Sequence, residues 1–167
     1  MPLKPQDLVV VLKLAVIDGS WPSFSALGLD LGISSSEVHA GVKRATKAHL
    51  LVPGRKPNKA NLYEFIAHGV RFAFYAQRGE ITRGMPTAHA APPLREEILA
   101  GDLPPVWPDP EGEVRGETFQ PLYRAVPTAA RNDARLYELL ALVDAIRGGR
   151  ARERALAIKL VKERLYR

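Results

Sequence analysis

Cysteine is absent from this chain of 167 residues. Without a thiol, the protein cannot form disulfide bonds, ligate zinc or an iron–sulfur cluster through cysteine, or use a cysteine nucleophile. This composition is typical of a reducing compartment, and we expect the protein to be cytoplasmic.

Long hydrophobic runs are also missing. The longest covers residues 8–17 and is interrupted by Lys13. It is too short for a membrane-spanning helix, which needs about 20 apolar residues. The charges of Asp7 and Lys13 argue against the core of a signal peptide. We therefore expect no contact with a membrane and interpret the run as a buried helix.

Sequence patterns for catalysis or cofactor binding are not found either. The four histidines do not have the spacing of a metal site. Ser35 and His39 are four residues apart, but no acid that would orient the histidine accompanies them. No glycine-rich phosphate loop follows a predicted strand. The sequence therefore predicts no metal, no cofactor and no enzymatic activity.

The net charge of +6 is distributed unevenly along the chain. Residues 1–90 carry 11 Lys and Arg against 6 Asp and Glu, residues 91–132 carry 4 against 7, and residues 133–167 carry 9 against 5. Two basic segments therefore flank an acidic one. Such segments are typical of proteins that bind a polyanion, although a basic surface can also serve solubility alone.

The first basic segment contains the pattern of two short helices joined by a tight turn. Within residues 24–49, apolar residues recur at helical spacing on both sides of Gly32, where glycine adopts a positive φ at little cost. Ser34 is placed to cap the second helix, and Glu37 adds negative charge to its first turn. The apolar pattern consists of Leu27, Leu31, Ile33, Val38, Val42 and Ala45.

Residues 27–38, LGLDLGISSSEV, resemble the helix-turn-helix of bacterial winged-helix transcription regulators of the MarR-like kind. The resemblance covers roughly the first third of the chain. It implies a DNA-binding domain over residues 1–79, whose recognition helix at about residues 35–48 enters the major groove of double-stranded DNA.

The wing of such a domain is expected to be short here. Residues 50–52 predict a strand, and a loop with three cations follows over residues 53–59. Residues 61–74 then carry a helical pattern in place of a second wing strand. We expect a wing reduced to a loop, so that DNA contact depends on the second helix and this loop. The predicted contacts are Ser34, Ser35, Ser36, His39, Lys43, Arg44, Lys47, Arg55, Lys56 and Lys59.

Residues 80–132 predict a proline-rich acidic arm. Nine of the 14 prolines lie between Pro86 and Pro127, and proline disrupts helices and central strands alike. A short helix is expected over residues 93–100. Because aromatic residues in the segment argue against disorder, we expect an extended arm that packs on its own domain or on a partner subunit.

Residues 133–167 predict a C-terminal helical hairpin. Residues 135–147 and 151–165 each carry an apolar stripe, and two glycines separate them. Neither helix can bury its stripe alone, so we expect the pair to pack on the first domain or on a second copy of the chain. The arginines around the glycines have two possible roles. They either bind phosphate or an acidic partner, or interact with the negative end of the helix dipole and with nearby glutamates. They are Arg147, Arg150, Arg152 and Arg154.

These features together predict a mainly α-helical protein with a helix-turn-helix domain, a reduced wing, a proline-rich arm and a C-terminal hairpin. We expect a sequence-specific transcription regulator that binds DNA as a homodimer. The alternative is a protein-interaction module, such as a DNA-binding antitoxin that holds a toxin through the acidic arm and the hairpin.

Overall fold

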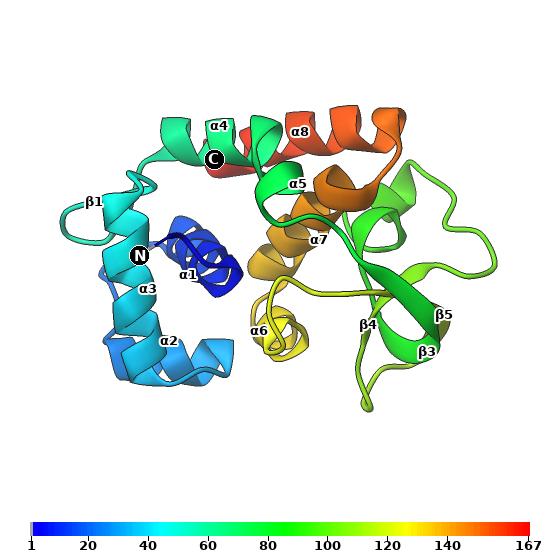
Figure 1. Cartoon of the computed structure of the whole chain (residues 1–167), viewed down its shortest axis with the longest axis horizontal. Coiled ribbons are helices and arrows are strands. Elements are labelled where there is room, and N and C mark those ends of the chain that lie inside the picture. Colours follow the sequence, from blue (N-terminus) through cyan, green and yellow to red (C-terminus); the bar gives the residue numbers. More distant parts are fainter. Residues whose placement is uncertain (1) are drawn as a thin grey trace.

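Helix α1 (Pro5–Val16) lies at the centre of the N-terminal half of the chain (Figure 1). The computed structural model describes residues 2–167, and in it every residue of α1 from Asp7 to Leu14 is buried. Proline at the first helical position is compatible with the helix because its missing N–H has no intrahelical acceptor there. The prediction of a buried helix is confirmed for residues 8–14, whereas residues 15–17 are half-buried and Ile17 lies just beyond the helix.

Two helices follow at the predicted positions. Helix α2 (Phe24–Leu31) begins after Ser23, whose Oγ accepts from the N–H of Ala26, and ends at Gly32. Helix α3 (Ser35–Lys47) begins after Ser34. Helix α2 packs on α3, and α3 also packs on α1. The sequence pattern therefore predicted these helices and their turn correctly.

A minimal hairpin follows α3. Strands β1 (Leu51–Val52) and β2 (Lys56–Pro57) pair antiparallel over two residues each. Helix α4 (Lys59–His68) and the single turn α5 (Val70–Ala73) then occupy most of the segment predicted to be helical, with Gly69 between them. The second strand of the hairpin is thus present, but it is only two residues long.

Residues 80–132 differ from the prediction, because they do not form an extended arm. Strands β3 (Arg78–Pro86), β4 (Pro105–Pro108) and β5 (Val114–Phe119) make a small closed β module, here residues 78–119. Strand β3 is antiparallel to both others, and β4 and β5 are parallel. The helix expected over residues 93–100 is reduced to the 3-10 turn η2 (Leu94–Glu96), and another 3-10 turn, η1 (Ala88–Ala90), precedes it.

Close backbone contact explains how strands β3, β4 and β5 close on one another. A Cβ built on Gly116 of β5 would lie 2.0 Å from the carbonyl oxygen of Pro104, next to β4. Only glycine permits this approach. Prolines at both ends of β4 are tolerated because the strand is only four residues long.

Helix α7 (Ala134–Gly148) holds the two halves of the molecule together. It packs against α1, α5, η1, α6 (Val126–Asn132) and α8 (Ala151–Leu165). Its N-cap Asp133 also pairs with the buried Lys13 of α1 at 2.8 Å. The predicted C-terminal hairpin is therefore present and packs on its own chain, which was one of the two expected arrangements.

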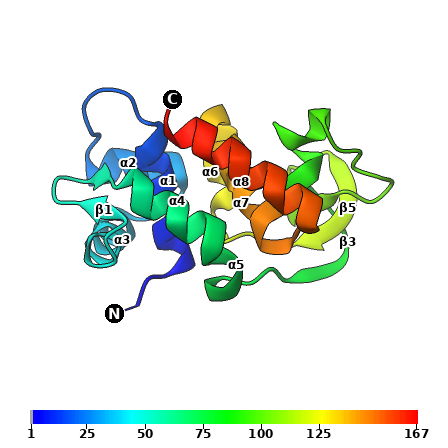
Figure 2. The ribbon, with the colours of Figure 1, turned by 90° about the horizontal axis from the view of Figure 1, so that it is seen from above.

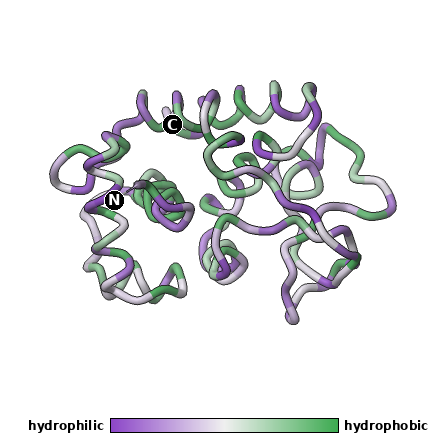
Figure 3. Tube along the Cα trace, viewed as in Figure 1, coloured by the Kyte–Doolittle hydropathy of each residue, from purple (hydrophilic) through white to green (hydrophobic). Residues whose placement is uncertain are grey.

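One hydrophobic core runs through the whole molecule. It includes residues of α1, α2, α3, α4, α6, α7 and α8 together with Trp107 of the β module. Figure 2 shows α8 lying beside α4 across the top of the molecule, and Figure 3 shows that α1 in the interior is largely hydrophobic. About 54% of the residues are helical, so the fold is helix-rich but mixed α/β.

Among residues 2–167, every helix is too short or too polar to cross a bilayer.

Candidate functional site

The turn between α2 and α3 fixes how the two helices cross. Gly32 has a φ of +72°, the left-handed conformation that ends α2. A Cβ on Gly28 would lie 2.5 Å from the carbonyl oxygen of Ile33. Any side chain at position 28 would therefore push the start of α3 away from α2.

The N-terminus of α3 is closed by a capping box. Ser34 Oγ accepts from the N–H of Glu37 at 3.1 Å, and the Glu37 carboxylate accepts from the N–H of Ser34 at 3.2 Å. Ser34 was predicted to contact DNA, and the structure gives it this capping role while leaving it exposed.

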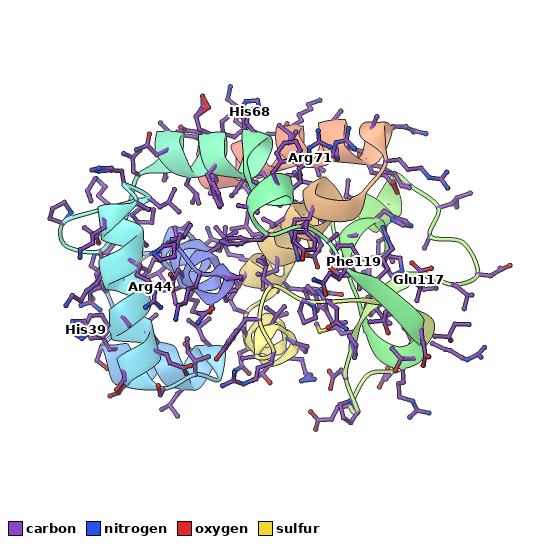
Figure 4. All side chains as sticks on the ribbon, in the orientation of Figure 1. His39, Arg44, His68, Arg71, Glu117 and Phe119 are labelled. Carbon is purple, nitrogen blue, oxygen red and sulfur yellow. The ribbon has the colours of Figure 1, made fainter. Side chains whose placement is uncertain are left out.

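Helix α3 has one buried and one exposed side. Val38, Gly41, Val42 and Ala45 are buried against α1 and α2. The exposed side, called here the α3 outer face, consists of Ser35, Ser36, His39, Lys43 and Lys47. In Figure 4, His39 points away from the body of the molecule. All five were predicted as contact residues, and the structure leaves all five accessible.

Arg44 must be removed from the predicted contacts. Its guanidinium forms two hydrogen bonds with the carboxylate of Asp7 on α1, Nε–Oδ2 at 2.7 Å and Nη2–Oδ1 at 2.9 Å. The side chain of Asp7 is 0% exposed and that of Arg44 is 13% exposed. The hydrogen bond raises the pKa of Arg44 above its usual value. Figure 4 shows Arg44 directed towards α1, so its charge stabilises the contact between α1 and α3.

A tyrosine from a distant segment also reaches α3. The hydroxyl of Tyr123 donates to Glu37 Oε1 at 2.8 Å. This hydrogen bond, followed by that from the Ser34 N–H, holds the pKa of Glu37 below its usual value of 4.5. The start of α3 is thereby connected to the segment between the β module and α6.

The aromatic ring of Phe24 supports the exposed histidine. The rings of Phe24 and His39 stack with their centroids 5.0 Å apart. Next to them is a hollow of about 370 Å³ lined by serines of α2 and α3. The polar groups at this end of the α3 outer face therefore surround a recess; they are Ser23, Ser25, Ser35, Ser36 and His39.

The three cations predicted in the loop of residues 53–59 have different environments. Arg55 donates to the carbonyl oxygen of Pro22 at 2.7 Å and lies over the Phe24 ring at 4.7 Å, so it fastens the hairpin to the start of α2. Lys59 is half-buried, with its Nζ 5.9 Å from the Tyr166 ring. Lys56 is exposed.

The predicted arginine cluster is divided by the fold. The side chain of Arg147 is 5% exposed, because it pairs with Asp144 at 2.7 Å and donates to the carbonyl oxygen of Phe74. Of the two alternatives for this cluster, Arg147 therefore fits the one in which the arginines interact with the helix end and with nearby acids. Arg154 is half-buried and donates to the carbonyl oxygen of Gly149. Arg150 and Arg152 are exposed.

Two residues of the site were missed by sequence reasoning. Asp7 was noted only as a charge before a hydrophobic run, although an acid at the edge of a buried helix needs a partner, and Arg44 is that partner. Tyr123 gave no signal, because nothing in the sequence places it beside Glu37, 86 residues away.

Residues 2–167 contain no group of three or more His, Cys, Asp or Glu side chains that could hold a metal ion. Comparison of the chain with protein families, with curated proteins and with solved structures found no match.

Proposed function

We propose that this protein is a sequence-specific DNA-binding transcription regulator and that the α3 outer face enters the major groove. The observation that carries the proposal is the set of five polar or cationic side chains exposed on a helix whose other side is buried against α1 and α2. A recognition helix needs this combination of a fixed inner face and an accessible outer face.

The residues of the face divide by the chemistry of their side chains. Ser35, Ser36 and His39 can exchange hydrogen bonds with base edges, which carry the sequence information. Lys43 and Lys47 are long cations at the C-terminal half of the helix and are suited to phosphate oxygens. Lys56 at the hairpin adds a further cation for the backbone of the duplex.

The order of elements supports a winged helix with a very short wing. Three helices, α1 to α3, are followed by the hairpin of β1 and β2, which is the order in winged helix-turn-helix domains. With only two residues in each strand, the hairpin presents few contacts beyond Lys56. The base contacts therefore fall mainly on α3.

We also infer that two copies bind one DNA site, since a single short recognition helix covers only a half-site. The C-terminal hairpin supplies less of a dimer surface than the sequence suggests, because the apolar face of α7 is covered by α1 and by other elements of the same chain. The antitoxin alternative loses its main support, since the acidic segment is folded into the β module and α6 rather than extended.

The proposal is tested by selecting bound duplexes from a random library and measuring their affinities by fluorescence anisotropy at several salt concentrations. Lys43→Ala is expected to weaken binding to all sequences and to reduce the slope of log K against log salt by about 0.9. His39→Ala is expected to relax the preference at one or two base pairs, at a cost of about 1–3 kcal/mol for the preferred site.

Arg83→Ala is the matched control, because Arg83 is an exposed cation of β3 outside the proposed face. It is expected to leave both the affinity and the salt slope nearly unchanged. The proposal fails if the wild-type protein shows no salt-dependent binding to any duplex, or if Lys43→Ala and Arg83→Ala behave alike.

A further inference from the structure

A second polar site lies at the opposite end of the molecule from α3. A pocket of about 600 Å³ is formed where the start of α8 meets β3, β5 and the loop of residues 98–101. Figure 1 shows the start of α8 and the β module on one side and α3 on the other. We call it the arginine pocket, after Arg78, Arg150 and Arg152 in its wall. Its volume is in the range of small-molecule sites.

The acidic groups of the arginine pocket are already engaged. Glu117 pairs with Arg78 at 3.1 Å. Glu153 lies 3.2 Å from His89 Nδ1 and also accepts from the backbone N–H of Arg150 at 2.9 Å. The charge of Glu117 is therefore balanced by Arg78, and the position of Glu153 is fixed by His89 and by the start of α8.

Two of the three arginines keep their charges unmatched. Within residues 2–167, the side chains of Arg150 and Arg152 make no ion pair, and both are exposed at the pocket. Arg78 is held in place by Glu117 and by the carbonyl oxygen of Gly148 at 2.8 Å, and its guanidinium lies over the Phe119 ring at 5.1 Å. The pocket thus combines one fixed and two adjustable guanidinium groups.

The other side of the pocket is apolar. Ile98, Leu99 and Ala100 line it, and Leu99 is 95% exposed, which is unusual for so large an apolar side chain. A ligand that carries an anionic group and an apolar portion would neutralise the arginines and cover this leucine at the same time.

We propose that the arginine pocket binds a small organic phosphate. Guanidinium groups bind phosphate oxygens through paired, charge-assisted hydrogen bonds. The three arginines of the pocket outnumber its two carboxylates, so a phosphate of charge near −2 meets a net positive charge. The pocket is concave and shares no residue with the α3 outer face, so the site is independent of the DNA-binding proposal.

The proposal is tested on the full chain by NMR, titrating 15N-labelled protein with phenyl phosphate at constant ionic strength. Saturable shifts are expected at the amides of Gly101, Gly148 and Arg152, with a Kd below about 1 mM. Benzoate supplies a carboxylate on the same ring, and phenol supplies the ring without charge. Both are expected to bind at least tenfold more weakly.

Two double variants separate the pocket from general charge. R150Q/R152Q is expected to weaken phenyl phosphate binding at least tenfold. R83Q/R115Q removes two exposed arginines that face each other across β3 and β5, and it is expected to leave binding unchanged. The unliganded spectra of both variants report whether the fold is kept.

Three results would overturn the proposal. The first is the absence of saturable shifts at the pocket up to about 10 mM phenyl phosphate, a concentration that detects even weak sites. The second is equal weakening by the two double variants. The third is equal binding of benzoate or phenol, which would remove the assignment to phosphate.

Discussion

Lys43 and Arg44 are adjacent in α3, yet their charges have different roles. Lys43 points to solvent, whereas Arg44 forms a bidentate ion pair with the fully buried Asp7. Removing one partner of a buried pair leaves an uncompensated charge, which costs about 3–5 kcal/mol. A change at position 44 would therefore act through the fold, and of these two positions only 43 tests the proposed DNA interface.

The capping box of α3 makes the start of this helix sensitive to acid. The pKa of Glu37 is lowered by the hydrogen bond from Tyr123 and then by that from Ser34. A carboxylate with a lowered pKa stabilises the fold at pH values above its ordinary pKa, and this stabilisation is lost as the pH falls through the lowered value. In Tyr123→Phe the pKa of Glu37 is expected to rise towards its ordinary value, so that the stabilisation is smaller and its loss is complete at a higher pH.

This prediction is checked by following the Glu37 carboxyl carbon by NMR during an acid titration. Tyr166→Phe is the control, because Tyr166 is exposed and does not contact Glu37. An unchanged Glu37 titration in Tyr123→Phe would show that the hydroxyl is not what lowers the pKa.

Local pattern was sufficient to predict the α2–α3 pair but not all of its charges. These helices are specified by features that act over a few residues, namely Gly32, the serine at the helix start and the apolar spacing. Such local features can be recognised in one sequence without an alignment. Whether a cation such as Arg44 or Arg55 faces solvent depends on residues far away in the chain, here Asp7 and Pro22. These contacts join residues that are far apart in the chain, so a local sequence pattern could not predict them.

At the scale of elements, one buried carboxylate joins the β module to α7. Asp144 Oδ2 accepts from the Thr87 hydroxyl and from Trp107 Nε1, each at 2.7 Å, and Oδ1 accepts from Arg147 at 2.7 Å. Asp144 is 1% exposed. Three donors from two parts of the chain therefore converge on a single side chain in a dry environment.

Asp144→Ala is expected to lower the free energy of unfolding by about 3–5 kcal/mol, because it leaves the buried Arg147 charge and two donors without a partner. Glu138→Ala is the control, since Glu138 also pairs with an arginine, Arg164 at 2.7 Å, but is 32% exposed. Its cost is expected to be about 1 kcal/mol or less. Urea denaturation measures both, and equal losses would contradict the role given to Asp144.

The β module was the element that sequence reasoning missed. Strands β4 and β5 are short, all three strands contain proline or glycine, and they do not alternate regularly between polar and apolar residues. Such strands are specified by their partners, through the contact of Gly116 with Pro104 and of Trp107 with Asp144. The proline-rich composition therefore led to the prediction of an extended arm. The segment instead forms a sheet, because residues distant in the sequence pair with one another.

At the scale of the whole molecule, the helix-turn-helix shares its core with the C-terminal hairpin. Helix α1 packs on α7, α4 packs on α8, and Lys13 pairs with Asp133. A fragment of residues 2–77 would expose the faces of α1 and α4 that these helices cover. We expect the fragment to show no cooperative thermal unfolding, in contrast to the full chain.

Circular dichroism and NMR of the fragment check this expectation under the conditions used for the full chain. Dispersed amide signals together with a sigmoidal melting curve would show that residues 2–77 form an independent domain, and that the shared core is dispensable for it.

The position of α7 and α8 in the chain also has a consequence for synthesis. The ribosome completes α5 at Ala73 long before it reaches Leu165 at the end of α8. At about 5–20 residues per second, the delay is roughly 5–20 s. During this interval the nascent chain carries α3 on a body whose apolar faces are still uncovered. Chaperone binding to α1 and α4 is therefore expected to be confined to this period of translation.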